Sequence, residues 1–176
     1  MTRILLISGS TRDGSTNTAA LRTVAALAPP GIDTHLYPGL RELPAFVPGA
    51  DPEDFSAVAA LRAELAAADA VLVCTPEYAG TLPGSMKNLL DWTVGTADLH
   101  EKPTAWLTVA VPGRGEGAVA TLSTVLGYVG AEVVERACAR LPVLAADLGE
   151  DGLVRPPEFR DGVSVVLAEL AAHLAN

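Results

Sequence analysis

Apolar positions along the chain follow two patterns, short continuous runs and longer stretches with helical spacing. The continuous runs lie at 4–7 and 70–74, and a third segment at 104–111 is largely apolar with two threonines. Runs of this kind are typical of strands that are buried on both faces of a parallel sheet. We therefore predict three central strands at these positions.

The stretches with helical spacing separate and follow these strands. Apolar residues recur every three or four positions in five stretches, at 20–27, 55–68, 84–94, 119–129 and 159–174. Such spacing predicts amphipathic helices that cover a sheet. Two further strands are expected at 33–37 and 132–141, and the Pro- and Gly-rich segment 39–52 is expected to be a loop.

These elements alternate strand and helix five times along the chain. Such alternation predicts an α/β fold, a doubly wound five-stranded parallel sheet in an αβα arrangement of three layers. The length of 176 residues fits a single domain over 1–176. Ligands of such sheets bind beyond the carboxyl ends of the strands. The loops after the three central strands are therefore the candidate site.

Composition narrows the class of protein. Hydrophobic residues make up 49% of the chain and charged residues 19%, which excludes a disordered chain. The formal charge of −9 disfavours nucleic acid and anionic membrane as partners. Two cysteines make no disulfide framework, and neither a signal peptide nor a membrane-spanning run is evident. We therefore expect a cytoplasmic protein.

The loop after the first strand combines groups that bind phosphate. Residues 9–18 contain two glycines, several hydroxyls, an amide and the cation Arg12. Glycine allows close approach of the backbone, a guanidinium suits phosphate, and the next helix points its N-terminal N–H groups at the same place. The loop therefore predicts a site for one terminal phosphate. A capped polar turn without a ligand is the alternative, although capping would not need Arg12.

The same loop lacks the motifs of other phosphate sites. It contains no G-x-x-x-x-G-K-[ST], no G-x-G-x-x-G and no cysteine. A Walker-type nucleotide site, a dinucleotide fingerprint and a phosphatase with a catalytic thiolate are thereby excluded.

The loop after the second central strand suits a flat ring. Residues 75–84 contain two prolines and two glycines, which predicts a rigid, tightly turned loop. It presents Tyr78 and backbone N–H groups, and a heteroaromatic ring needs such donors at its edge and an apolar wall on its face. An ordinary rigid turn with a packed tyrosine is the alternative.

The loop after the third central strand is also rich in glycine. Gly113 and Gly115 could bring N–H groups to the edge of such a ring, where donors would stabilise negative charge on it. Arg114 could instead attract the phosphate of a nucleotide, or it could be an exposed side chain in a flexible turn.

Two motifs together resemble one enzyme family. Gly9-Ser10-Thr11-Arg12 with Ser15 and Asn17 is similar to the phosphate loop of NAD(P)H-dependent FMN reductases. The second signature of that family resembles Pro76-Glu77-Tyr78 followed by Pro83-Gly84-Ser85-Met86-Lys87-Asn88 and Asp91-Trp92. The family includes flavin, quinone, azo and chromate reductases on a flavodoxin-like fold.

The resemblance implies a set of cofactor-binding residues. The FMN phosphate would be held by Ser10, Arg12, Ser15, Thr16 and Asn17. The isoalloxazine ring would be lined by Pro76, Glu77, Tyr78, Ala79 and Gly80, and the third loop would add Gly113, Arg114 and Gly115. At Ala79 the family frequently has Asn, so this chain lacks a polar side chain near the ring. No metal ligands are expected, because the three histidines are scattered and neither cysteine adds a suitable spacing.

The predicted activity is that of an FMN-dependent NAD(P)H oxidoreductase. Hydride would pass from NADPH or NADH to the flavin N5 and then to a small acceptor such as a quinone, azo compound, flavin or metal oxyanion. No side chain need act as a catalyst, and Tyr78 is a candidate only for shaping substrate access. The resemblance also implies a homodimer or a tetramer. A flavodoxin-type electron carrier and a non-catalytic flavin-binding module are the alternatives.

Three further side chains have structural interpretations. Lys87 and Asp91 are spaced for a surface ion pair on a helix. Trp92 is expected in the core or in a subunit interface. Cys74 lies within an apolar run and is expected to be a small buried hydrophobe.

Overall fold

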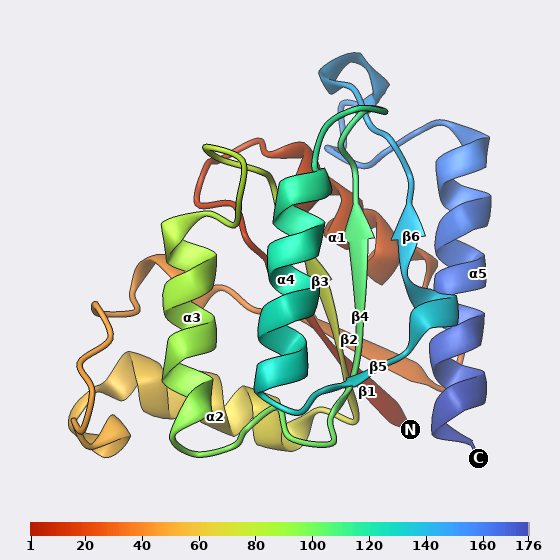
Figure 1. Cartoon of the computed structure of the whole chain (residues 1–176). Coiled ribbons are helices and arrows are strands. Elements are labelled where there is room, and N and C mark those ends of the chain that lie inside the picture. Colours follow the sequence, from red (N-terminus) through yellow and green to blue (C-terminus); the bar gives the residue numbers. More distant parts are fainter. Residues whose placement is uncertain (176) are drawn as a thin grey trace.

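The computed structural model describes residues 1–175 and contains one parallel sheet with helices on both faces (Figure 1). Its strands are β1 (Thr2–Ser8), β2 (Ile32–Leu36), β3 (Ala70–Cys74), β4 (Pro103–Thr108), β5 (Glu132–Val133) and β6 (Ala139–Arg140). The helices are α1 (Thr16–Leu27), α2 (Ser56–Ala67), α3 (Gly84–Val94), α4 (Glu116–Tyr128) and α5 (Pro157–Leu174). Short 3₁₀ turns are η1 (Gly39–Arg41), η2 (Pro52–Asp54), η3 (Glu135–Ala137) and η4 (Ala145–Asp147).

The strands are parallel and follow the order β2-β1-β3-β4-β5, with β6 also paired to β4. This is the order of flavodoxin-like proteins, in which the sheet winds outward in both directions from its first strand. The predicted doubly wound parallel sheet is therefore confirmed. The switch in winding direction lies between β1 and β3, next to the loops singled out by the sequence.

The last strand differs from the prediction. A continuous strand over 132–141 was expected, but η3 interrupts it, so β5 and β6 pair separately with β4. The turn places Ala137, which is fully buried, in the core that α5 covers. Burying the Ala137 side chain therefore favours a 3₁₀ turn over a continuous strand at this edge of the sheet. The strand expected over 104–111 also ends early, at Thr108.

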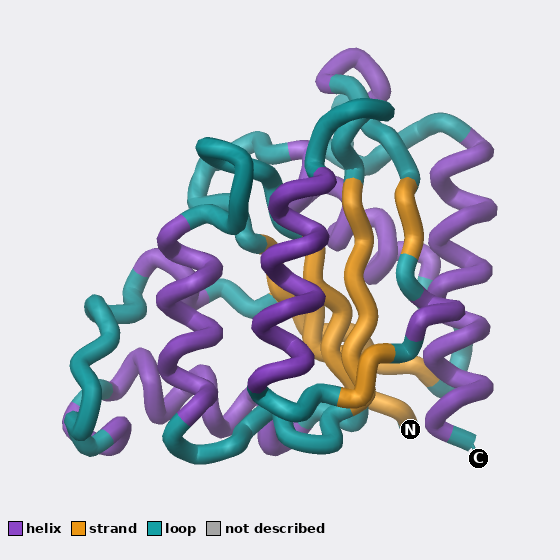
Figure 2. The backbone as a smooth tube through the Cα atoms, in the orientation of Figure 1, coloured by secondary structure: helices purple, strands orange, loops and turns teal. Residues whose placement is uncertain are grey.

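Alternate residues of the strands enter two separate cores. Ile4 and Leu6 of β1 pack in the cluster that includes α1 and α5, whereas Leu5 and Ile7 pack in the cluster with α2, α3 and α4. Figure 2 shows the strands as one layer between the helices. The period-2 alternation of a strand buried on both faces produces these three layers.

The loops after β1, β3 and β4 meet at the same edge of the sheet, the upper edge in Figure 1. Gly9 shows how closely they approach. A Cβ atom at this position would lie 2.1 Å from Oγ1 of Thr75, so only glycine fits between the first two loops.

The segment between β2 and α2, residues 39–55, crosses outside α3 and is fixed to it. The side chains of Asn88 and Trp92 both donate to the carbonyl of Pro44, each at 2.9 Å, and Asn88 Oδ1 accepts from the N–H of Phe46 at 2.8 Å. The Phe46 ring packs edge-on against Trp92. Trp92 is 2% exposed, which confirms its expected place in the core.

The surface of α3 also agrees with the prediction, because Lys87 Nζ lies 2.6 Å from Oδ1 of Asp91. Across residues 1–175, no helix combines the length and apolar character needed to cross a membrane.

Candidate functional site

Residues from all three loops line one cavity of about 430 Å³. Thr16 and Asn17 follow β1, Pro76 and Glu77 follow β3, and Arg114 and Gly115 follow β4; all six line it. Thr75, Val109, Ala110, Val111 and Val143 complete the lining. The structure therefore brings together loops that are about 100 residues apart in the sequence.

The N-terminus of α1 forms one end of this cavity. Ser15 is the N-cap, and its hydroxyl accepts from the N–H of Asn17 at 3.2 Å. Among the described residues, the backbone N–H groups of Thr11, Ser15 and Thr16 have no hydrogen-bond partner. Free N–H groups at the positive end of a helix dipole bind anions. The loop therefore fits the phosphate group of FMN.

The side chain of Asn17 is oriented by a hydrogen bond from Cys74 at the end of β3. Its Oδ1 accepts from Sγ of Cys74 at 3.3 Å, and both side chains are buried. Burial raises the pKa of the Cys74 thiol well above its usual range, so the thiol stays protonated and donates. Cys74 is thus the buried residue that the sequence predicted. Its contact leaves the Asn17 amide nitrogen as a donor at the cavity.

A second cavity of about 540 Å³ lies on the other side of the same loop. Ser10 and Arg12 line this cavity rather than the first, together with Arg22, Tyr37 and Arg41. The predicted phosphate ligands therefore line two cavities that both border this loop, and Ser15 is buried as the N-cap of α1. Within residues 1–175 the guanidinium of Arg12 has no hydrogen-bond or ion-pair partner.

Arg22 and Arg41 were not among the predicted site residues. Arg22 lies one turn of α1 beyond Thr18, so helical spacing from the loop was a signal for it. No local pattern indicates Arg41, which reaches the loop from 30 positions away.

The loop after β3 makes a tight hairpin. Tyr78 and Thr81 exchange backbone hydrogen bonds of 3.0 and 3.1 Å, and the two residues between them, Ala79 and Gly80, have φ angles of 51° and 76°. A two-residue turn with both φ angles positive normally contains Asn or Gly. Ala79 therefore occupies a position where an alanine is strained. The Tyr78 side chain is 51% exposed, so it is not a packed tyrosine in this chain.

The carboxylate of Glu77 is directed to the third loop. Its Oε2 accepts from the N–H of Ala118 in the first turn of α4 at 3.1 Å. Gly117 packs against the same hairpin, and a Cβ there would lie 2.0 Å from the carbonyl oxygen of Gly80. Thr81 and Thr121 add a contact of 2.8 Å between their hydroxyls. The second and third loops therefore form one unit.

The third loop presents glycines in conformations that other residues avoid. Gly113 and Gly115 have φ angles of 80° and 84°, and Gly115 is the N-cap of α4. Arg114 lies between them and lines the first cavity. Its side chain has no partner in the part of the chain that the structure describes. No group of three or more His, Cys, Asp or Glu residues among those described is placed to hold a metal ion.

The fold and this edge define the class of protein, a flavodoxin-like α/β protein in which three loops line one cavity at the carboxyl edge of the sheet. Comparison with known protein families supports this class. The NADPH-dependent FMN reductase family matches residues 2–142, and the chain belongs to that family.

Similar proteins carry related names. An NADPH azoreductase from Bacillus sp. (strain OY1-2) is 32% identical over 180 residues, covering 98% of this chain and 93% of that protein. The quinone reductase of Escherichia coli (strain K12) is 30% identical over 119 residues, which cover 66% of this chain and only 62% of the enzyme. The solved structure of FerB, a flavoenzyme NAD(P)H:(acceptor) oxidoreductase from Paracoccus denitrificans, has a TM-score of 0.82 and 25% identity, covering 98% of this chain and 99% of that one.

Proposed function

We propose that this protein is an FMN-dependent NAD(P)H oxidoreductase that reduces quinones or azo compounds. The observation that carries the proposal is the cavity where Thr16, Glu77 and Arg114 meet beside the free N–H groups of the α1 N-terminus. Membership of the FMN reductase family and the names of the relatives support it.

When bound, FMN supplies the hydride chemistry between NAD(P)H and the acceptor. The chain binds and orients it. We assign the phosphate to Ser10, Arg12, Ser15, Thr16 and Asn17. We assign the ring to Pro76, Glu77, Tyr78, Ala79 and Gly80, with Gly113, Arg114 and Gly115 at its other edge. Glu77 contributes to ring binding indirectly. Its carboxylate accepts a hydrogen bond from α4 and so fixes the second loop against the third.

No side chain in the cavity is required as a nucleophile or general acid. The nearest thiol, Cys74, is fully buried and has a raised pKa, so it is neutral and unreactive. The chain's contribution is therefore to exclude water from one face of the ring and leave the other open. An open face accommodates planar acceptors of different kinds. We assign to Tyr78, which is half exposed in the loop after β3, a role in shaping their access.

The oligomeric state is part of the proposal. We infer a homodimer, or a tetramer built from two such dimers, formed through α3 and α4. Val94 at the end of α3 is 58% exposed, and Tyr128 at the end of α4 is 89% exposed. Exposed apolar side chains on neighbouring helices favour association. A cytoplasmic location is also proposed, supported by the two free thiols Cys74 and Cys138 and by the NAD(P)H requirement.

Rapid mixing of the FMN-loaded protein with NADPH or NADH tests the activity. We expect the absorbance of oxidised flavin to be lost directly, and to return when a quinone or azo dye is added. A flavodoxin-type electron carrier, which the net charge of −9 would suit for docking to a basic redox partner, would show no loss within seconds. A non-catalytic flavin-binding module would give the same negative result. Failure to retain FMN at all would reject the proposal.

A further inference from the structure

Arg41 of η1 holds the loop that follows β1. Its Nη2 donates to the carbonyl of Thr11 and lies 2.8 Å from Oδ1 of Asp13. These two contacts flank Arg12, whose own guanidinium is free within residues 1–175. One guanidinium thus fixes the loop from outside, while the other remains available to a ligand.

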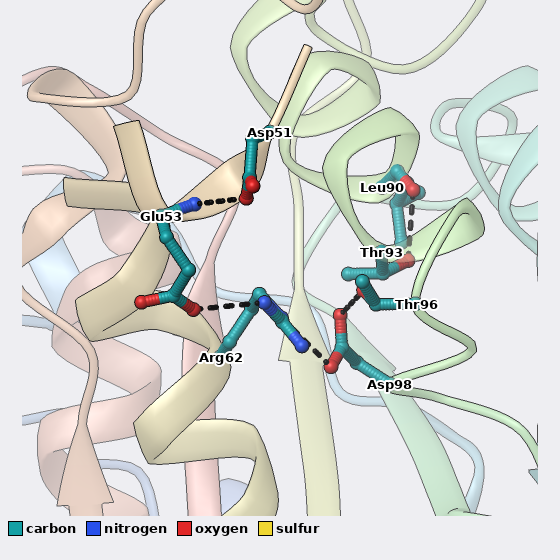
Figure 3. A network of polar contacts seen from close by, with 7 residues as sticks. All are labelled: Asp51, Glu53, Arg62, Leu90, Thr93, Thr96 and Asp98. Atoms are coloured by element: carbon teal, nitrogen blue, oxygen red, sulfur yellow. Dashed lines mark hydrogen bonds and ion pairs between the residues drawn. The ribbon is translucent and has the colours of Figure 1, made fainter. Parts of the chain in front are cut away.

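The segment that delivers Arg41 is itself anchored. Pro44 and Phe46 are tied to α3 through Asn88 and Trp92. At the far end, Arg62 of α2 lies 3.1 Å from Oε1 of Glu53 and 3.4 Å from Oδ1 of Asp98, as Figure 3 shows. Residues 39–55 therefore form a strap with attachments at both ends and in the middle, and Arg41 is its contact with the β1 loop.

Charge gives this contact a consequence for anion binding. Asp13 is the only acid in the loop, and it stands one position from Arg12. Unpaired, its carboxylate would repel a phosphate dianion on the same loop. Arg41 offsets that charge and lines the same cavity as Ser10 and Arg12.

Backbone geometry adds a second consequence. In a trans peptide the C=O and N–H groups point in opposite directions. By holding the carbonyl of Thr11, Arg41 fixes the plane of the peptide that joins Thr11 to Arg12. The Arg12 N–H then meets Oγ of Ser10 at 3.3 Å. The backbone of Arg12 and the hydroxyl of Ser10 are thereby held in place before any ligand arrives.

We propose that Arg41 is a positioning residue for the phosphate group of the cofactor, acting through Thr11 and Asp13. The inference rests on the proposed FMN binding. It assigns to the strap between β2 and α2 a role in selecting a phosphorylated flavin over riboflavin.

Flavin affinity measured by fluorescence quenching tests the proposal. For Arg41→Ala we expect about fivefold weaker FMN binding, because the Arg41–Asp13 ion pair is exposed to solvent and therefore screened, and riboflavin binding within about twofold of the wild type. Arg41→Lys, which retains the charge, should recover part of the loss. Adding Asp13→Asn to Arg41→Ala should also recover part of it, because the unpaired carboxylate is removed.

A matched control and a second readout complete the test. Arg62→Ala removes a guanidinium of α2 that contacts Glu53 at the other end of the strap (Figure 3), so FMN affinity should be retained. In the apo protein, Arg41→Ala should speed amide hydrogen exchange in residues 9–15. Equal losses for FMN and riboflavin, or no loss for either, would overturn the role of Arg41 and leave the proposed function standing. Absence of FMN binding to the wild type would instead reject the proposed function.

Discussion

The carboxylate of Glu77 caps helix α4 across the sheet edge, with Oε2 3.1 Å from the N–H of Ala118. The N-cap position itself is Gly115, which has no side chain to do this. Glu77→Ala should lower the free energy of unfolding by about 1 kcal/mol, the usual value of a capping interaction, and weaken flavin binding because the second and third loops separate. Urea denaturation with and without FMN measures both effects.

Glu77→Gln is the matched variant. Its amide oxygen can still accept from Ala118, while the favourable interaction of a negative charge with the helix dipole is lost. We expect the free energy of unfolding of Glu77→Gln to lie closer to that of the wild type than to that of Glu77→Ala. A Glu77→Ala protein as stable as the wild type would show that α4 needs no cap from this loop.

Gly117 is the second point where these loops touch. A Cβ here would lie 2.0 Å from the backbone oxygen of Gly80, an atom that cannot turn away. Gly117→Ala should therefore cost about 2 to 3 kcal/mol through overpacking. Gly127→Ala in the same helix is the control, because a Cβ at that exposed position would have no neighbouring atom within 4 Å. That variant should be neutral or more stable by up to about 1 kcal/mol. Equal stabilities for the two variants in thermal unfolding would contradict the contact.

Much of this architecture could be predicted from local pattern. The runs at 4–7 and 70–74 correspond to strands buried on both faces, and alternating order alone led to the observed sheet. The three loops predicted at one edge do line one cavity, because parallel strands end at the same side. The spacing of apolar residues and the alternation of strands and helices can both be read along the chain, and they were sufficient to predict the parallel sheet and the edge where its loops meet.

Contacts between distant residues could not be predicted. Arg41 lies in a segment that composition describes only as loop, yet it holds Thr11 from 30 positions away. The Glu77 cap links residues 41 positions apart. The 3₁₀ turn within the last strand depends on a core position for Ala137 that α5 provides. Each depends on tertiary packing, which overrides local preference.

Ala79 is a strained position in the hairpin after β3. Its φ of 51° costs an L-residue other than Asn, Asp or Gly roughly 1 kcal/mol. Ala79→Gly and Ala79→Asn should therefore each raise the free energy of unfolding by up to about 1 kcal/mol. Ala120→Gly is the matched control: that alanine is exposed within α4, where glycine should lower stability by about 1 kcal/mol. The same exchange should thus have opposite signs at the two positions in urea denaturation. A loss of stability at both would show that the turn is relaxed.

Arg12 is the cation of the loop after β1, and its guanidinium is unpaired within residues 1–175. Arg12→Ala should weaken FMN binding about tenfold or more, since a charge-assisted phosphate contact contributes roughly 1.5–3 kcal/mol. The apo protein should unfold as the wild type does, because the guanidinium has no partner among the described residues. Titration of flavin fluorescence measures the affinity, and Arg136→Ala, which removes an exposed arginine from η3, controls for net charge. Unchanged affinity in Arg12→Ala would remove this residue from the site.

Tyr37 carries a buried hydroxyl without a partner in the part of the chain that is described. The residue is 7% exposed, and burial raises its pKa from 10.0 to about 12, with Glu42 and Glu64 adding to the effect. Below pH 10 both the folded and the unfolded chain keep the proton. Between pH 10 and 12 only the unfolded chain releases it, so stability must fall as the pH rises through this window.

Replacement of Tyr37 by Phe should remove that fall. We expect Tyr37→Phe to match or exceed the wild type by up to about 1 kcal/mol at neutral pH, because a buried hydroxyl without a hydrogen bond costs free energy. Between pH 10 and 12 the wild type should lose roughly 1 to 2 kcal/mol more than the variant. Chemical denaturation at several alkaline pH values measures the difference. Tyr128→Phe is the control, since it removes the same hydroxyl from a residue that is 89% exposed. Identical pH dependence of the wild type and Tyr37→Phe would mean that the Tyr37 hydroxyl titrates as it does in water.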